Sequence, residues 1–350
     1  MNKTKVLNFF RSAQKDCADL YLLCDKEITM NKTYNYRPGN GSDGEVFKAT
    51  ARKIEEMSRT RDLSSLREIL ANAIFNLRHL INAMHSRKIP IKPWMEHLEV
   101  ILVKMSLHAS SINELSKATP LSRDDSASFI DISSSYILSR ALLENYLIFF
   151  YLYMLPKDDG EAQFHNLLYK LSGLCNRQKY QVSLALSILK KEKEFQEIIA
   201  LRKLLEKNGY FQQLSEKEKK SLLGSSPKAS LYSWGQLIDK SHLKGEHFSS
   251  SWKMYSNHAH SEYIGSMQLI SYFQDTEALT HTIFHNLEAT LLVLAVAITD
   301  LLNLFPELIP VFDAEIDASG KSFIHYWSVV GLRKNINSGE PSVGPISESC

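Results

Sequence analysis

Residues 251–273, SWKMYSNHAHSEYIGSMQLISYF, combine a helical apolar pattern with a cluster of ionisable side chains. The apolar residues recur at steps of three and four, which places on one helical face Trp252, Tyr255, Ala259, Tyr263, Met267 and Ile270. A helix with such a stripe buries it against other elements. The stretch therefore predicts one unbroken helix with a buried face, flanked by polar side chains.

The same periodicity covers most of the chain on both sides of this stretch. Longer helices are predicted at residues 5–28, 46–57, 63–85, 94–115, 128–155, 161–174, 178–189, 192–207, 277–305 and 323–332. We expect Asp62 and Asp275 to act as N-caps, and Ser215 with Glu218 to form a capping box ahead of a short helix. Another short helix is expected at residues 234–239. Alternating strand patterns are almost absent, so the predicted fold class is all-α, a multi-helix bundle with an N-terminal helical appendage.

Proline and clusters of serine and aspartate divide this pattern into four parts. Residues 1–118 form an N-terminal helical region, and residues 128–305 are expected to form the main helical bundle with a polar site. Residues 306–335 follow two prolines and are expected to pack on the bundle. Residues 336–350 are rich in glycine, proline and serine, a composition typical of a disordered tail.

The composition limits the class of protein. A chain of 350 residues with 44% hydrophobic content can bury a large core, and a net charge of +2 does not by itself indicate nucleic-acid or membrane binding. The four cysteines lack CxxC spacing and the N-terminus lacks a signal-peptide pattern. The longest apolar runs, 145–155 and 289–299, are shorter than the roughly 20 residues that a membrane span needs. We expect a cytoplasmic protein with no membrane partner.

A charged pair interrupts the most apolar helix. Glu144 falls on the face expected to be buried, and Arg140 precedes it by one helical turn. A carboxylate in such a place must be paired, protonated or solvated, because an unpaired buried charge costs several kcal/mol or more. Two interpretations are open: an ion pair that fixes the helix register, or two polar groups that face a cleft.

The polar residues of the opening stretch form two pairs with helical spacing. Ser256 and His260 share one face, and His258 and Glu262 share another. A hydroxyl or carboxylate beside an imidazole can set its tautomer and proton affinity for acid–base catalysis. A structural histidine or an interface contact uses the same arrangement. His258 and His260 point about 200° apart on a regular helix, which excludes their chelating one metal ion.

Further patterns carry weaker signals. His281, His285 and Glu288 share a face with spacing that suits zinc or iron, but we expect a solvated face there rather than a metal site. Arg78 and His85 lie two helical turns apart and match the Arg-x4-6-His motif of HEPN-type ribonucleases. The glycine-rich residues 35–44 lack the Gly-Lys-Ser/Thr ending of a phosphate-binding loop, so we expect a plain connection there.

Two features together resemble a bacterial family of helical proteins of undefined function that is distantly HEPN-like. They are the apolar helix with Arg140 and Glu144, and the later Trp234 followed by Tyr255-Ser256-x-x-x-His260. The resemblance covers about residues 128–305. It implies one site, between two helices, that contains Arg140, Glu144, Ser256 and His260. Genes of this kind occur among mobile elements and phage-defence systems.

From the resemblance and the residues together we expect a metal-independent ribonuclease, or a protein that binds RNA or a nucleotide. The expected catalytic residues are His260, Glu144, Arg140, Ser256 and His258. His260 would act as acid or base, Arg140 would bind phosphate, and Glu144 would orient one of them. No cofactor or metal is expected, and long apolar helices favour a homo-oligomer. The alternatives are a non-enzymatic interaction or regulatory module and a metal-dependent hydrolase.

Overall fold

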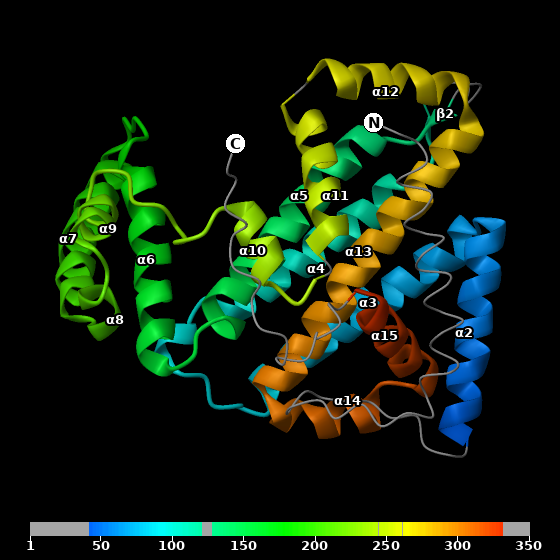
Figure 1. Cartoon of the computed structure of the whole chain (residues 1–350), viewed down its shortest axis with the longest axis horizontal. Coiled ribbons are helices and arrows are strands. Elements are labelled where there is room, and N and C mark those ends of the chain that lie inside the picture. The colour runs from blue at the N-terminus through cyan, green and yellow to red at the C-terminus, as the bar shows by residue number, and fades with distance from the viewer. Residues whose placement is uncertain (1–41, 121–127, 244, 261, 332–350) are drawn as a thin grey trace, which may run out of the picture.

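The computed structural model describes residues 42–120, 128–243, 245–260 and 262–331, and these are almost entirely helical (Figure 1). The helices are α2 (Ser42–Thr60), α3 (Leu63–Ser86), α4 (Leu98–Leu115), α5 (Ile132–Phe149), α6 (Asp159–Gln178), α7 (Ala185–Lys207), α8 (Gly209–Gln212), α9 (Glu216–Leu222), α10 (Trp234–Lys240), α11 (Gly245–Ala259), α12 (Tyr263–Gln274), α13 (Thr276–Leu304), α14 (Ile309–Glu315) and α15 (Ala318–Gly331). Extended structure among them is limited to β1 (Thr119–Pro120) and β2 (Ser128–Phe129), which pair antiparallel. The predicted all-α helical bundle is therefore confirmed. The predicted helix at residues 5–28 and the predicted tail lie outside the described residues.

Helix α13 is the centre of the bundle. Its side chains are apolar on every face from Leu291 to Ile298, and all of these residues are buried. A helix that is hydrophobic all round needs neighbours on all sides, and α13 contacts α3, α5 and α15 most extensively. By length and mean hydropathy α13 could cross a membrane, but 83% of its most apolar window is buried inside the protein. That burial is typical of a core helix.

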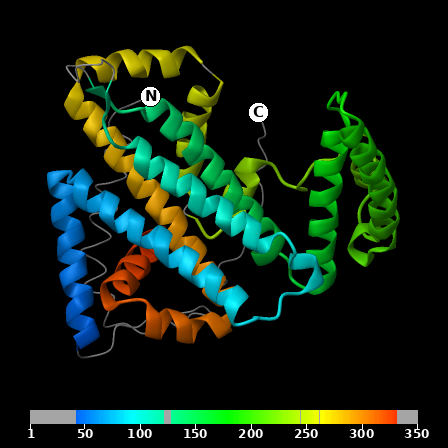
Figure 2. The same ribbon diagram turned by 180° about the vertical axis from the view of Figure 1, so that it is seen from behind.

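Helices α6 to α9 form a second, smaller core that we call the lobe. It contains Phe164, Leu168 and Leu171 from α6, packed against Leu201 and Leu205 from α7. The lobe lies to one side of the bundle in both views (Figures 1 and 2). Helices α3 and α4, in contrast, share one continuous core with α5 and α13. Whether residues 1–118 form a separate region stays a prediction.

The local start and stop signals are confirmed where the structure describes them. The Asp62 carboxylate accepts hydrogen bonds from the first backbone amides of α3, and Asp275 caps α13 in the same way. Ser215 and Glu218 form the predicted capping box at α9. Helix α13 ends before Pro306. These signals act within one turn of chain, so packing elsewhere does not override them.

The prediction of one unbroken helix over residues 251–273 is wrong. Helix α11 ends at Ala259 and α12 begins at Tyr263, after Glu262 adopts an extended conformation as N-cap. Gly265 lies so close to α11 that a Cβ there would meet the carbonyl oxygen of Asn257 at 3.1 Å. The chain folds back because α12 must cross the end of the bundle to reach α13 (Figure 1). As a result, the second half of the predicted stripe is exposed, with Tyr263 74% accessible.

The predicted helix over residues 178–189 is also wrong. Helix α6 continues to Gln178, and α7 runs without a break from Ala185 to Lys207. Between them the chain reverses direction, and Lys191 Nζ donates hydrogen bonds to the carbonyl oxygens of Gln178 and Tyr180. This side chain closes the connection between α6 and α7. A lysine eleven to thirteen residues away leaves no periodic signal in the sequence.

One histidine in the lobe makes stability depend on pH. Burial lowers the pKa of His165 to about 4, although its Nδ1 donates a hydrogen bond to the carbonyl oxygen of Tyr151, which opposes the shift. Because the unfolded chain binds this proton near pH 6.5, the contribution to stability is complete above that pH. It is lost as the pH falls from about 6.5 towards 4.

We predict that His165→Asn weakens the acid sensitivity of folding. Asparagine keeps a donor for Tyr151 but cannot be protonated in this range. Between pH 7.5 and pH 5 the variant should lose about 2 kcal/mol less free energy of unfolding than the wild type, measured by urea denaturation. His85→Asn, at an exposed position on α3, is the control and should match the wild type. Equal losses in all three proteins would contradict the prediction.

Candidate functional site

The structure brings together side chains from α5 and from the end of α11. Arg140 and Glu144 lie one turn apart on α5, whereas Trp252 lies on α11 and His260 directly follows it. The two helices pack against each other along their length. Residues separated by more than a hundred positions therefore form one polar cluster, which we call the Arg140 cluster.

Glu144 and Trp252 hold the guanidinium group of Arg140. Arg140 Nε donates to Glu144 Oε1 at 2.9 Å, and Trp252 Nε1 donates to the same oxygen at 3.0 Å. The guanidinium also lies over the indole ring, 5.1 Å from its centroid, which is a cation–π contact. The predicted Arg140–Glu144 ion pair is thus present. These contacts fix both the position and the plane of the guanidinium group.

The remaining contact of the Arg140 cluster is with an imidazole. Arg140 Nη1 lies 3.1 Å from His260 Nε2. Arginine can only donate, so Nε2 accepts, and His260 is the neutral tautomer with its hydrogen on Nδ1. Arg140 and Glu144 are partly exposed, with side-chain accessibilities of 19% and 25%, and His260 is exposed. The arginine is therefore oriented by the fold while the histidine faces solvent.

Ser256 does not join this cluster as predicted. Its hydroxyl donates to the carbonyl oxygen of Trp252 at 2.7 Å, one turn back along α11. Serine in a helix makes this bond readily because the carbonyl four residues earlier lies within reach. The predicted pairing of the Ser256 hydroxyl with the His260 imidazole is wrong, because the hydrogen bond between these two residues joins the backbone amide of His260 to the backbone carbonyl of Ser256.

His258 lies in a different place from His260 and is buried. Its Nδ1 accepts from the Ser133 hydroxyl at 3.2 Å, and its Nε2 donates to Gln268 Oε1 at 2.9 Å. Burial lowers the pKa of His258, and the bond to Gln268 opposes that shift. The partner of Nε2 is Gln268 rather than the predicted Glu262, because α12 folds back over α11. His258 therefore joins α5, α11 and α12, and its catalytic role stays a prediction.

The face with His281, His285 and Glu288 is not the solvated surface that one interpretation expected. Glu288 is buried, and its carboxylate contacts His285 Nδ1 at 3.0 Å and the Ser58 hydroxyl at 3.4 Å. His281 lies 3.8 Å from Glu277 instead. Within the described residues, no three histidine, cysteine, aspartate or glutamate side chains lie close enough to hold a metal ion.

Arg78 and His85 do not form a site either. Arg78 donates to the hydroxyls of Ser106 and Ser110, which ties α3 to α4. His85 is exposed on the last turn of α3. The arginine is used in helix packing, so the match to the HEPN motif at these positions has a structural explanation.

A polar group that the sequence analysis missed lies at the other end of α13. Asp300 is buried, and it accepts from Tyr146 OH at 2.9 Å and contacts His242 Nδ1 at 2.6 Å. The π-helical residues Phe150–Met154, at the end of α5, lie beside it, because Phe150 packs edge-on against the His242 ring. The sequence feature that could have indicated this group is the carboxylate of Asp300, which ends the apolar run 289–299. This group joins α5, α13 and the segment before α11.

No protein-family model matches this chain, and no match was found among curated proteins or solved structures. The structure shows an all-helical fold, and the resemblance to HEPN-like families stays a prediction.

We predict that Asp300→Asn destabilises the protein. An amide cannot accept from both Tyr146 and His242 as the carboxylate does, and a buried donor without an acceptor costs about 1–3 kcal/mol. The free energy of unfolding, measured by urea denaturation at pH 7.5, should fall by that amount. Glu307→Gln, at an exposed position, is the matched control and should change it by less than about 0.5 kcal/mol. A similar small change in Asp300→Asn would contradict the prediction.

Proposed function

We propose that the Arg140 cluster is a phosphodiester-binding site and that the protein is a metal-independent ribonuclease. The observation that carries the proposal is the contact between Arg140 Nη1 and His260 Nε2. It places a cation suited to phosphate beside a group suited to proton transfer. The resemblance to HEPN-like families points to the same chemistry, and to a role in phage defence or in a mobile-element system.

Substrate binding would release the histidine for catalysis. A phosphate oxygen beside Arg140 is a stronger hydrogen-bond acceptor than a neutral imidazole, so Arg140 Nη1 would donate its hydrogen bond to the phosphate. His260 Nε2 would then be available to remove the proton of a ribose 2′-hydroxyl. The 2′-oxygen would attack phosphorus, and the bond to the 5′-oxygen would break as that oxygen takes a proton from solvent water, giving a 2′,3′-cyclic phosphate. The protonated His260 would then return its proton to the solvent. Arg140 would stabilise the charge that develops on the phosphoryl oxygens.

The other members of the cluster would position these two groups. Glu144 and Trp252 already fix the guanidinium plane, so little ordering is needed when phosphate binds. Tyr263, three residues after His260, is 74% exposed. An exposed aromatic ring is the side chain on which unpaired bases stack. Single-stranded RNA is therefore the substrate that suits the cluster best.

A second candidate function is a non-enzymatic interaction module. It is favoured by large apolar side chains that α3 and α4 leave exposed, including Phe75 (67%), Val100 (66%) and Leu107 (55%). Apolar residues on two packed helices suit a symmetric contact with a second copy, so the same residues support the proposed homo-oligomer. In this function the Arg140 cluster would only hold α11 on α5.

We predict that the purified protein cleaves single-stranded RNA in the presence of EDTA and that His260→Ala lowers the rate at least about 100-fold. Arg140→Lys should lower it similarly, because lysine lacks the planar fork that Glu144 and Trp252 orient. His85→Ala is the matched histidine control on α3 and should cleave at the wild-type rate. The products are separated by gel electrophoresis, and urea denaturation checks that each variant is folded.

Two results would contradict the ribonuclease proposal. One is wild-type protein that leaves the RNA intact, and the other is equal cleavage of an oligonucleotide with 2′-deoxyribose at every position, since the mechanism needs the 2′-hydroxyl. Loss of folding in His260→Ala, rather than loss of cleavage alone, would favour the interaction module.

A further inference from the structure

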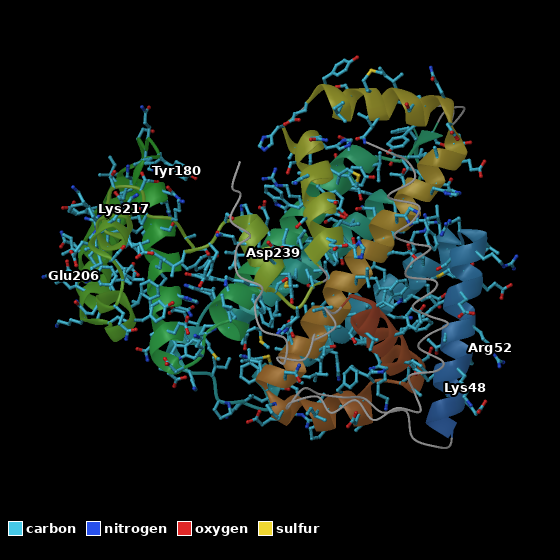
Figure 3. The ribbon with its side chains drawn as sticks, in the orientation of Figure 1. Lys48, Arg52, Tyr180, Glu206, Lys217 and Asp239 are labelled. Carbon is cyan, nitrogen blue, oxygen red and sulfur yellow. The ribbon has the colours of Figure 1, made fainter. Side chains whose placement is uncertain are left out.

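The tip of the lobe carries an unusual set of exposed apolar side chains. The connection from α6 to α7 and the first turn of α7 form what we call the tip, residues 180–189. Its large apolar residues are mostly exposed: Tyr180 (66%), Val182 (38%), Leu184 (72%), Leu186 (81%), Ile188 (50%) and Leu189 (58%). Figure 3 labels Tyr180 near the upper end of the lobe. Single exposed apolar residues are ordinary, but six in ten positions are not.

The packing of the lobe does not need these side chains. Helix α7 faces α6 through Ile198, Leu201 and Leu205, which lie beyond the tip. The tip is nevertheless a built structure, because Lys191 Nζ bonds to two carbonyl oxygens across it and Gln178 Nε2 donates to the Lys191 carbonyl oxygen at 3.1 Å. A rigid loop that exposes apolar side chains to solvent indicates that the tip is a surface for binding a partner.

Positive charge surrounds the tip. Residues 178–193 contain Lys179, Lys190, Lys191 and Lys193 with Glu192 as the one acidic residue, a net charge of +3, whereas the whole chain carries +2. Lys190 and Lys193 are exposed. Lys179 and Lys191 also line a hollow of about 530 Å³, together with Tyr180, Val182 and Ile188 of the tip. Residues 178–193 therefore combine exposed apolar side chains with a local net charge of +3.

The exposed apolar side chains and the nearby lysines together decide whether the tip binds a second copy of the protein or a lipid bilayer. A second copy docked tip to tip would bring the lysines of both copies together, and like charges repel. A negatively charged bilayer surface complements them, and its acyl boundary accepts the apolar side chains that the tip exposes. Tyrosine and leucine suit the boundary between headgroups and acyl chains.

We propose that the tip binds reversibly to the surface of bilayers that contain anionic phospholipids. Leu184, Leu186 and Leu189 enter the headgroup–acyl boundary, and Lys190 and Lys193 contact lipid phosphates. The inference is independent of the proposed ribonuclease site, because the Arg140 cluster lies on the bundle and the tip lies on the lobe. The proposal concerns peripheral binding and adds a partner that the sequence analysis did not expect.

We predict that full-length protein co-sediments with phosphatidylcholine vesicles containing 30% phosphatidylglycerol, at least about ten times more strongly than with phosphatidylcholine alone at low salt. Leu186→Ser combined with Leu189→Ser should lower that binding at least about tenfold, because it removes the exposed apolar anchors. Lys190→Glu combined with Lys193→Glu should lower it similarly, and 0.5 M salt should weaken the wild-type binding.

Helix α12 offers a matched control. It exposes Met267 (43%) and Ile270 (51%) but contains no charged residue. Met267→Ser combined with Ile270→Ser should bind vesicles as the wild type does. Three results would overturn the proposal: wild-type protein that stays in solution with anionic vesicles, equal loss of binding in the α12 variant, or light scattering that shows a dimer dissociated by the Leu186/Leu189 variant without vesicle binding. The last result would assign the tip to a second copy.

Discussion

The burial of α13 on every side is the constraint on which the bundle depends. A helix with apolar side chains all round cannot rest at a surface, so α3, α5 and α15 must cover it. These neighbours come from both ends of the described chain, which brings α3 and α15 into one core. The polar groups buried along α13 need partners on neighbouring elements, and Glu288 and Asp300 find them on α2, α5 and the segment before α11. Each such pair sets the register of a covering helix relative to α13.

Helix α12 follows from the same constraint. Helices α11 and α13 both pack against α5, so the chain between them must turn at the end of the bundle. The turn separates two histidines only two residues apart. His258 is drawn under α12 and bonded to Gln268, while His260 remains at the surface beside Arg140. One local change of direction thus gives one histidine a structural environment and the other an exposed one.

Local signals predicted much of the fold, and long-range contacts explain where prediction failed. Asp62, Asp275 and Ser215 act on amides within one turn, so their helix starts could be read directly. The association of Arg140, Glu144 and His260 was also predicted, from the resemblance and from the cost of an unpaired Glu144. The break before Tyr263 could not be, because residues 251–273 keep helical periodicity through it. The partners of Asp300, Tyr146 and His242, could not be predicted either, since a contact between distant residues leaves no periodic pattern in the sequence.

The Arg140 cluster combines features of a structural network and of a binding site. Trp252 and Glu144 would hold α11 on α5 even without a ligand, and a fully satisfied network often serves only packing. One contact sets this cluster apart from the groups at Glu288 and Asp300. Arg140 Nη1 donates to the uncharged imidazole of the exposed His260, although a negatively charged acceptor would bind the cation more strongly. An anion that accepts the hydrogen bond from Arg140 Nη1 gives the cation a negatively charged partner and leaves His260 Nε2 able to accept a proton. No such gain is available at Asp300, where the carboxylate already has two donors.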